Sequence, residues 1–143
     1  MEYETTLLIP YQTSFTNPVT REITLFPGII ERVGIIIPEG SADLARFAID
    51  YRGIQIWPAN RDGYFHGDNT QKDWSENLDI SDGEARFIIR GWNLSLRNNH
   101  TIGVWFVVNK QGVTLKDLMT VLSSNLSIRV EPGEEFTEEE EEN

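Results

Sequence analysis

The residues best suited to chemistry lie together in a polar stretch, residues 58–71. Asn60, Asp62 and Asp68 supply amide and carboxylate oxygens around two glycines, and Ca²⁺ binds about six to eight such oxygens in a bent loop. The Asp-x-Asp-x-Asp-Gly pattern with a closing Glu is missing, however. The simpler interpretation is a loop in which Asn, Asp and Gly form turns, so we expect no metal here.

The remaining reactive groups do not form a recognisable catalytic set. The chain has no Cys, which excludes disulfides, thiolate metal sites and Cys nucleophiles. His66 and His100 both fall in predicted loops, and a catalytic or metal-binding pair would need them to converge with a carboxylate. No P-loop, Gly-x-Gly-x-x-Gly turn, Gly-x-Ser-x-Gly elbow or His-Glu-x-x-His motif occurs. The sequence therefore predicts a protein that is not an enzyme and has no cofactor.

Aromatic side chains gather around the same polar stretch and favour binding over catalysis. They are Trp57, Tyr64, Phe65 and Trp74. Flat rings of this kind bind sugars or partner proteins. One hypothesis is a carbohydrate-binding platform with Asp62 or a neighbouring aspartate beside it. The other hypothesis is a contact surface for a protein partner.

Trp92 and Trp105 are a second aromatic pair, placed on predicted strands. On each strand the tryptophan points away from the main apolar set, because side chains alternate between the two faces. Ile88 and Val107 share that face. We therefore expect the face to be covered, by a helix at 114–122, by an arm or by a second sheet.

β-Strands would position these side chains. Between turn signals in residues 29–108, apolar and polar side chains alternate with a period of two, which is the period of a strand. In Ala45–Tyr51 every odd position is apolar and two of the three even positions are charged, as in a strand with one buried face. Ile29–Ile37 is apolar on both faces, as expected of a central strand. Further stretches with strand character are 19–26, 54–57, 74–80, 84–92 and 101–108. The pattern predicts an all-β fold, an antiparallel β-sandwich or jelly roll, with a strand-rich barrel as the alternative.

Terminal segments flank the predicted sandwich. The four parts are an N-terminal arm (1–18), the β-sandwich core (19–110), a helix and short terminal strand (111–130), and an acidic disordered tail (131–143). Thr114 would cap a short C-terminal helix with an apolar stripe. In the arm, Tyr3, Thr5, Leu7 and Ile9 fall on alternate positions, so this segment could form a strand that adds to the sheet edge of a neighbouring molecule.

The formal net charge of −11 resides mainly in the tail. Residues 131–143 contain eight of the 23 acidic residues and no Lys or Arg, which leaves 15 acids against 12 bases, a net charge of −3, in residues 1–130. No basic stripe is present, so we expect no nucleic-acid binding. No apolar run reaches the roughly 20 residues that span a bilayer, and the N-terminus lacks the features of a signal peptide. We therefore expect no membrane association.

Four short motifs between residues 27 and 108 resemble those of a small β-sandwich protein found among tailed bacteriophages and prophage-like regions. They are a Pro-x-Gly turn, a hairpin end, a strand end and a strand start: Pro38-Glu39-Gly40, Gln55-Ile56-Trp57-Pro58, Trp92-Asn93 and His100-Thr101. The resemblance implies a virion or assembly component, and it carries over no catalytic residues.

We therefore expect a non-enzymatic structural or assembly protein of a virus particle, such as a capsid-decoration, capsid-stabilising, neck or tail component. Its expected location is the virion, after assembly in the host cytoplasm. Its expected partners are other virion proteins and copies of itself in a homo-oligomer. The residues expected to contact partners are Tyr3, Leu7, Ile9, Trp57, Tyr64 and Phe65. The alternatives are a carbohydrate-binding β-sandwich module and a small hydrolase centred on His66 or His100.

Overall fold

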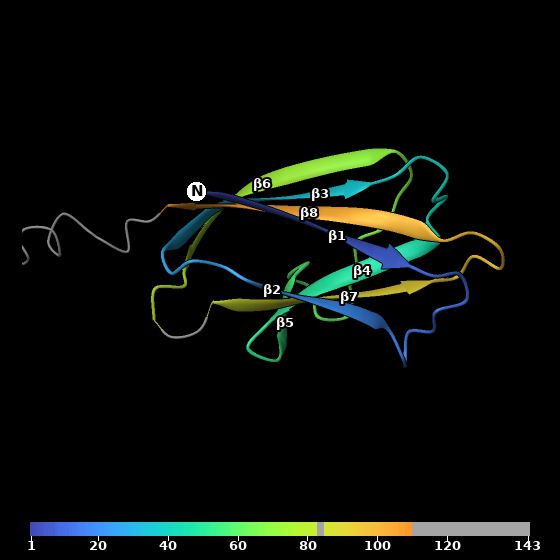
Figure 1. Ribbon diagram of the computed structural model, residues 1–143, viewed down its shortest axis with the longest axis horizontal. Coiled ribbons are helices and arrows are strands. Elements are labelled where there is room, and N and C mark those ends of the chain that lie inside the picture. Colours follow the sequence, from blue (N-terminus) through green and yellow to red (C-terminus); the bar gives the residue numbers. More distant parts are fainter. Residues whose placement is uncertain (83–84, 110–143) are drawn as a thin grey trace, which may run out of the picture. The chain divides into compact units, whose positions relative to one another are not determined.

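A computed structural model describes residues 1–82 and 85–109, and these residues form eight β-strands (Figure 1). The strands are β1 (Glu2–Ile9), β2 (Val19–Thr24), β3 (Ile29–Ile37), β4 (Ala45–Tyr51), β5 (Ile54–Trp57), β6 (Thr70–Asp79), β7 (Arg86–Asn93) and β8 (His100–Asn109). The described residues include no helix, and so no helical segment that could cross a membrane. The predicted helix at 114–122, the terminal strand and the acidic tail lie outside the described residues.

The eight strands form two antiparallel sheets stacked as layers (Figure 1). One sheet has the order β1-β8-β3-β6 and the other has the order β2-β7-β4-β5. The first strand pairs with the eighth, the second with the seventh, the third with the sixth and the fourth with the fifth. This is the connectivity of a long hairpin rolled into two layers, a jelly roll. The all-β sandwich prediction is confirmed.

Side-chain alternation explains how the strands pair. In β4, Phe47 and Ile49 are fully buried, whereas Arg46 is partly exposed. A slip of one residue in the pairing would turn both apolar side chains toward water. The tight turn to β5 consists of Arg52 and Gly53, with φ angles of 55° and 78°. A two-residue hairpin turn of type I′ requires positive φ at both central residues.

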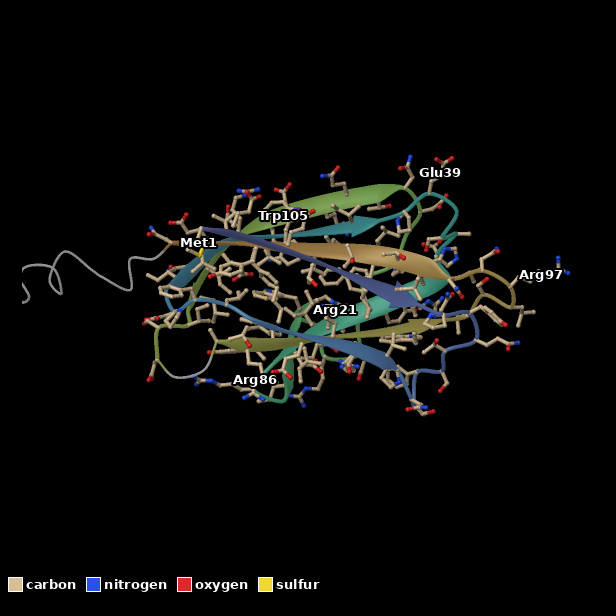
Figure 2. The ribbon with its side chains drawn as sticks, viewed as in Figure 1. Met1, Arg21, Glu39, Arg86, Arg97 and Trp105 are labelled. Atoms are coloured by element: carbon tan, nitrogen blue, oxygen red, sulfur yellow. The ribbon has the colours of Figure 1, made fainter. Side chains whose placement is uncertain are left out.

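The hydrophobic core fills the space between the two sheets (Figure 2). Phe87 of one sheet and Phe106 of the other are fully buried, and their ring centroids lie 5.4 Å apart. Burial of a large apolar side chain is worth roughly 1.5–3 kcal/mol. Because the chain has no Cys, packing of this kind, without disulfide cross-links, holds the layers together.

Residues 2–9, which were predicted to be part of an N-terminal arm, form a strand of the sandwich itself. They form β1, which pairs with β8 along its whole length. Leu7 and Ile9 point into the core and are buried, and Tyr3 is half-buried. Ile9 packs against Gly91 of β7, where a Cβ atom would lie only 2.5 Å from Cδ1 of Ile9. The side chains of Leu7 and Ile9 are therefore taken up by this fold and are not displayed to a neighbour.

Candidate functional site

The face of the β2-β7-β4-β5 sheet that points away from the core carries arginine and aromatic side chains. They come from β4 and β7, where they alternate with buried residues such as Phe47. Arg46 lies opposite Trp92 in the β4–β7 ladder, and Asp50 lies opposite Ile88. Because alternate residues of a strand share a face, these side chains form one continuous surface, which we call the outer face.

One half of the outer face is aromatic. The ring of Trp92 meets Phe15 edge-on, with 4.9 Å between centroids, and meets Tyr64 at 5.6 Å. The guanidinium carbon of Arg46 lies 4.8 Å from the centroid of the Tyr64 ring, a cation–π contact. Trp92 is buried beneath this cover, whereas Phe15 is 61% exposed. We call Phe15, Arg46, Tyr64 and Trp92 the aromatic cluster. Trp92 itself is therefore covered, as predicted, whereas Ile88 on the same face is only half-buried.

Two loops bring Phe15 and Tyr64 onto this sheet. The backbone of Thr13 forms a β-bridge to the end of β7. The backbone of Phe65 exchanges two hydrogen bonds with β4, of 3.1 and 2.8 Å. Each loop therefore continues the sheet for a short distance, and the neighbouring aromatic side chain is held against the outer face.

An ion pair lies beside the aromatic cluster. Arg90 contacts Asp50 through two hydrogen bonds, Nε to Oδ2 at 2.6 Å and Nη2 to Oδ1 at 3.1 Å. The two side chains are only 24% and 16% exposed, so water screens them incompletely. Arg90 also donates to Oε1 of Gln55 at 2.9 Å, and the Gln55 amide donates to the carbonyl of Gly63 at 3.1 Å. The network thus ties the loop that carries Tyr64 to the ion pair.

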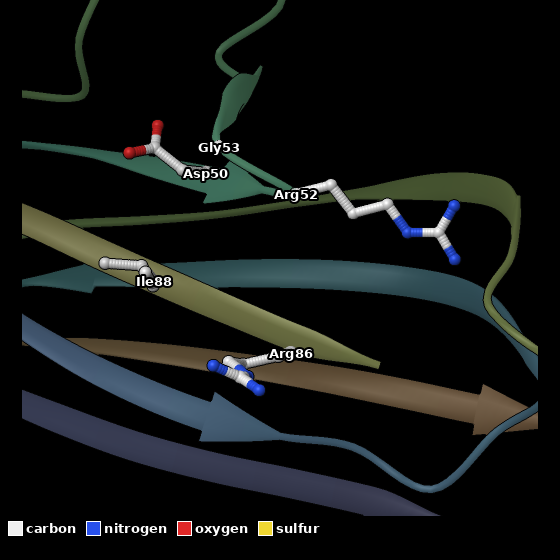
Figure 3. Close-up of a pocket in the computed structure, with 5 residues that line it drawn as sticks. All are labelled: Asp50, Arg52, Gly53, Arg86 and Ile88. Carbon is white, nitrogen blue, oxygen red and sulfur yellow. The ribbon is translucent and has the colours of Figure 1, made fainter. Parts of the chain in front are cut away.

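A pocket of about 420 Å³ lies at the β4–β5 hairpin (Figure 3). Along the β4–β7 ladder it lies on the far side of the ion pair from the aromatic cluster. It is lined by Asp50, Arg52, Gly53, Arg86 and Ile88. The Arg86 side chain also pairs with Glu22, Nε to Oε2 at 3.1 Å, and Arg52 donates to the backbone carbonyl of Asp82. Arginine side chains bind carboxylates, so a lining that includes Arg52 and Arg86 suits an acidic group of a binding partner.

Three of the four aromatic residues predicted to form a sugar platform lie inside the sandwich instead. Trp57 and Phe65 are buried and Trp74 is half-buried. The indole N–H groups of Trp57 and Trp74 both donate to Oε2 of Glu76, each at 2.9 Å. These contacts join β5 of one sheet to β6 of the other. Only Tyr64 of the four reaches the outer face, so the predicted platform is not assembled.

The loop oxygens considered as calcium ligands are engaged with protein groups or lie at the surface. Oδ1 of Asp68 accepts hydrogen bonds from backbone N–H groups of the turn at residues 40–42. The carbonyl of Asn60 accepts one from the N–H of Gly63 at 2.8 Å, and Asp62 is exposed. Within the part of the chain that the structure describes, no three His, Cys, Asp or Glu residues are grouped so that they could hold a metal ion.

The two histidines lie in different surroundings. His66 is exposed and its Nδ1 lies 3.0 Å from Oδ1 of Asp43. His100 is buried, and its Nε2 has no hydrogen-bond partner among the described residues. Neither histidine lines the pocket at the β4–β5 hairpin. Among the described residues, the two histidines share no hydrogen bond or ring contact.

The sequence alone does not single out Phe15, Arg46, Arg90 or Gln55 as site residues. The alternation in Ala45–Tyr51 already places Arg46 and Asp50 on the outward side of one strand. It does not reveal which residues of other strands lie beside them, because cross-strand neighbours depend on the pairing register.

No known protein family matches this chain, and no curated protein matches it significantly. The class that its structure defines is a jelly-roll β-sandwich with an arginine-rich and aromatic sheet face. Such a face is suited to binding a protein partner, because Tyr, Trp and Arg dominate the energetics of protein interfaces.

Proposed function

We propose that this protein is a non-enzymatic structural or assembly component of a virus particle and that it binds other virion proteins through its outer face. Its place is on the capsid, as a decorating or stabilising protein, or at the neck or tail. The observation that carries the proposal is the aromatic cluster with the adjoining Arg90–Asp50 pair, displayed on a jelly-roll sheet.

The fold supports the class of protein by analogy. The jelly roll is an architecture of viral capsid proteins as well as of lectins and cupins. The lectin analogy has less support here, because Trp57, Phe65 and Trp74 pack inside the sandwich. The resemblance to a phage β-sandwich protein points in the same direction as the capsid analogy.

The composition of the outer face supports a protein partner. The rings of Phe15 and Tyr64 both contact the buried Trp92, and Phe15 is exposed. Arg46 is already oriented by its contact with the Tyr64 ring and by a 3.1 Å hydrogen bond to the carbonyl of Asp43. Side chains held in place before binding lose less conformational entropy when a partner docks.

The proposal is tested with particles purified from the virus or induced prophage that encodes the chain. Mass spectrometry should find the protein in a fixed ratio to the major shell protein, and its absence from the particles would contradict the proposal. Particles that lack the protein are then incubated with purified chain. Tyr64→Ala and Arg46→Ala should each weaken binding by about 2 kcal/mol, roughly thirtyfold. Lys72→Ala, on β6 of the other sheet, is the matched control and should bind like the unaltered protein.

A further inference from the structure

Among the described residues, β1 is the outermost strand of its sheet and has a neighbouring strand on one side only. It pairs with β8 on one side, and no other strand within residues 1–82 and 85–109 pairs with it. It is eight residues long, and its pairing with β8 contains no bulge. A straight strand with an open edge is a template onto which another strand can add.

The ladder to β8 shows which backbone groups point to the open side. Met1 and Val108 exchange both of their backbone hydrogen bonds, each 2.7 Å long. In an antiparallel ladder, hydrogen-bonded pairs alternate with pairs whose N–H and C=O groups point away from each other. The residues of β1 whose backbone groups point to the open side are Glu2, Glu4, Thr6 and Leu8.

The other three outer strands of the sandwich are protected by charge or by short length. β6 carries Lys72 and Asp73, and β2 carries Glu22 and Arg21, of which Arg21 is labelled in Figure 2. β5 is only four residues long. The charged side chains of β1, Glu2 and Glu4, lie in its first half, and residues 5–9 carry none. Charged residues and short strands are the usual means by which sheets avoid edge-to-edge pairing, so the second half of β1 is the least protected stretch of these edges.

We propose that β1 pairs with β1 of a second copy of this chain, antiparallel, so that two β1-β8-β3-β6 sheets become one continuous sheet. The inference deepens the proposed function, and it rests on that function for the expectation that the protein contacts copies of itself. A two-fold axis relates the copies, so both contribute the same strand and the contact is closed.

Charge selects the register of this pairing. With the axis at Thr5, Leu8 faces Glu2 of the second copy and Thr6 faces Glu4 of the second copy. No glutamate then faces another glutamate. An axis at Glu4 would put that residue opposite itself, and like charges directly opposite each other are destabilising. An axis at Thr6 would leave Glu2 beyond the end of the partner strand, because β1 ends at residue 9.

Opposite charge changes at Leu8 test the register in the full 143-residue chain, by sedimentation velocity over a range of concentrations. The unaltered protein should rise from 16.4 kDa toward twice that mass as concentration increases. Leu8→Glu places a like charge opposite Glu2 in both halves of the interface, and Leu8→Lys places an opposite charge there. The dimer dissociation constant should rise on the order of tenfold for the first and fall for the second. Leu8 is 53% exposed, so both variants should fold.

A second pair of variants tests the backbone contact. Thr6→Pro removes an N–H that points to the open side and leaves the hydrogen bonds to β8 in place. Thr6→Val keeps that N–H. The proline variant should remain a monomer and the valine variant should dimerise, with circular dichroism used to confirm that each is folded. If the proline variant does not fold, the two Leu8 variants decide the question.

Three results would each overturn the inference. They are an unaltered protein that stays at 16.4 kDa at every concentration, equal dimerisation of the two Leu8 variants, and a folded Thr6→Pro variant that dimerises fully. None of these results involves the outer face. Failure of β1 pairing is therefore distinguishable from failure of the proposed function, which is judged by particle binding of the Tyr64 and Arg46 variants.

Discussion

At the scale of single residues, Glu76 joins the two sheets where their outer strands β5 and β6 meet. One of its carboxylate oxygens accepts hydrogen bonds from the indole N–H groups of both Trp57 and Trp74. The Trp57 ring also stacks on Phe87, with 5.8 Å between centroids. A buried indole N–H that loses its acceptor retains its desolvation cost, so a single acidic side chain supports the packing of two tryptophans.

We therefore expect Glu76→Ala to lower the free energy of unfolding by about 1–3 kcal/mol, because it leaves two indole donors without an acceptor. Glu76→Gln keeps an acceptor oxygen and should cost less. Urea unfolding followed by tryptophan fluorescence measures both values. Equal stability of the alanine variant and the unaltered protein would contradict this account of the contact.

Asp79 shows a second effect of a local hydrogen bond. The hydroxyl of Ser81 and then its backbone N–H, at 2.9 Å from Oδ1, hold the pKa of Asp79 below its ordinary value of 3.8. Because the pKa is lowered in the folded state, this contact adds stability above the unfolded pKa. That stability is lost as the pH falls through the folded pKa.

Ser81→Ala should raise the pKa of Asp79 toward its ordinary value, since it removes the larger of the two causes and keeps the backbone hydrogen bond. The carboxyl carbon signal of Asp79 in an NMR titration reports this pKa directly. Ser81→Thr retains a hydroxyl and is the control, with an expected pKa close to that of the unaltered protein. An unchanged pKa in the alanine variant would show that the hydroxyl does not act on this carboxylate.

At the scale of elements, β3 and β8 pack together around a glycine. Gly34 on β3 lies opposite Trp105 on β8, and a Cβ atom at Gly34 would overlap the indole ring of Trp105. Trp105 is half-buried, so its predicted cover is only partial. The absence of a side chain at Gly34 is what allows the ring to lie flat on the sheet.

Gly34→Ala should therefore displace the Trp105 ring and destabilise the protein by about 1–3 kcal/mol, as overpacking does. Gly103→Ala is the matched control on β8, because the nearest atom to a Cβ there, Cβ of Ile36, is 3.5 Å away, an ordinary contact. Thermal unfolding compares the two. A similar loss of stability in both variants would mean that the cost comes from the strand backbone and not from the tryptophan.

At the scale of the described sandwich, the two sheets differ in the groups that they could use to bind other molecules. In the proposed function, the β2-β7-β4-β5 sheet presents side chains to a partner, through the aromatic cluster and the Arg90–Asp50 pair. The β1-β8-β3-β6 sheet presents backbone groups at the edge of β1. A protein with two such surfaces can bind a different molecule and a copy of itself at the same time, and repeated weak contacts of this kind add up in a lattice.

The amino-acid sequence alone determined most of the strands and turns, although β6 begins at Thr70, four residues before the predicted stretch. Alternation placed β4, β7 and β8 and their buried faces correctly, and Arg52-Gly53 marked a hairpin, because side-chain period and turn geometry are local properties of the chain.

The tertiary structure alone decided which strands lie side by side and what covers each face. It placed β1 within the sandwich's own sheet, turned Trp57 and Trp74 inward onto Glu76, and brought Phe15, Tyr64 and Arg46 onto Trp92. Contacts of this kind join residues that are distant in sequence. The period-two pattern is the same whether a strand's apolar face meets a neighbouring molecule or its own second layer.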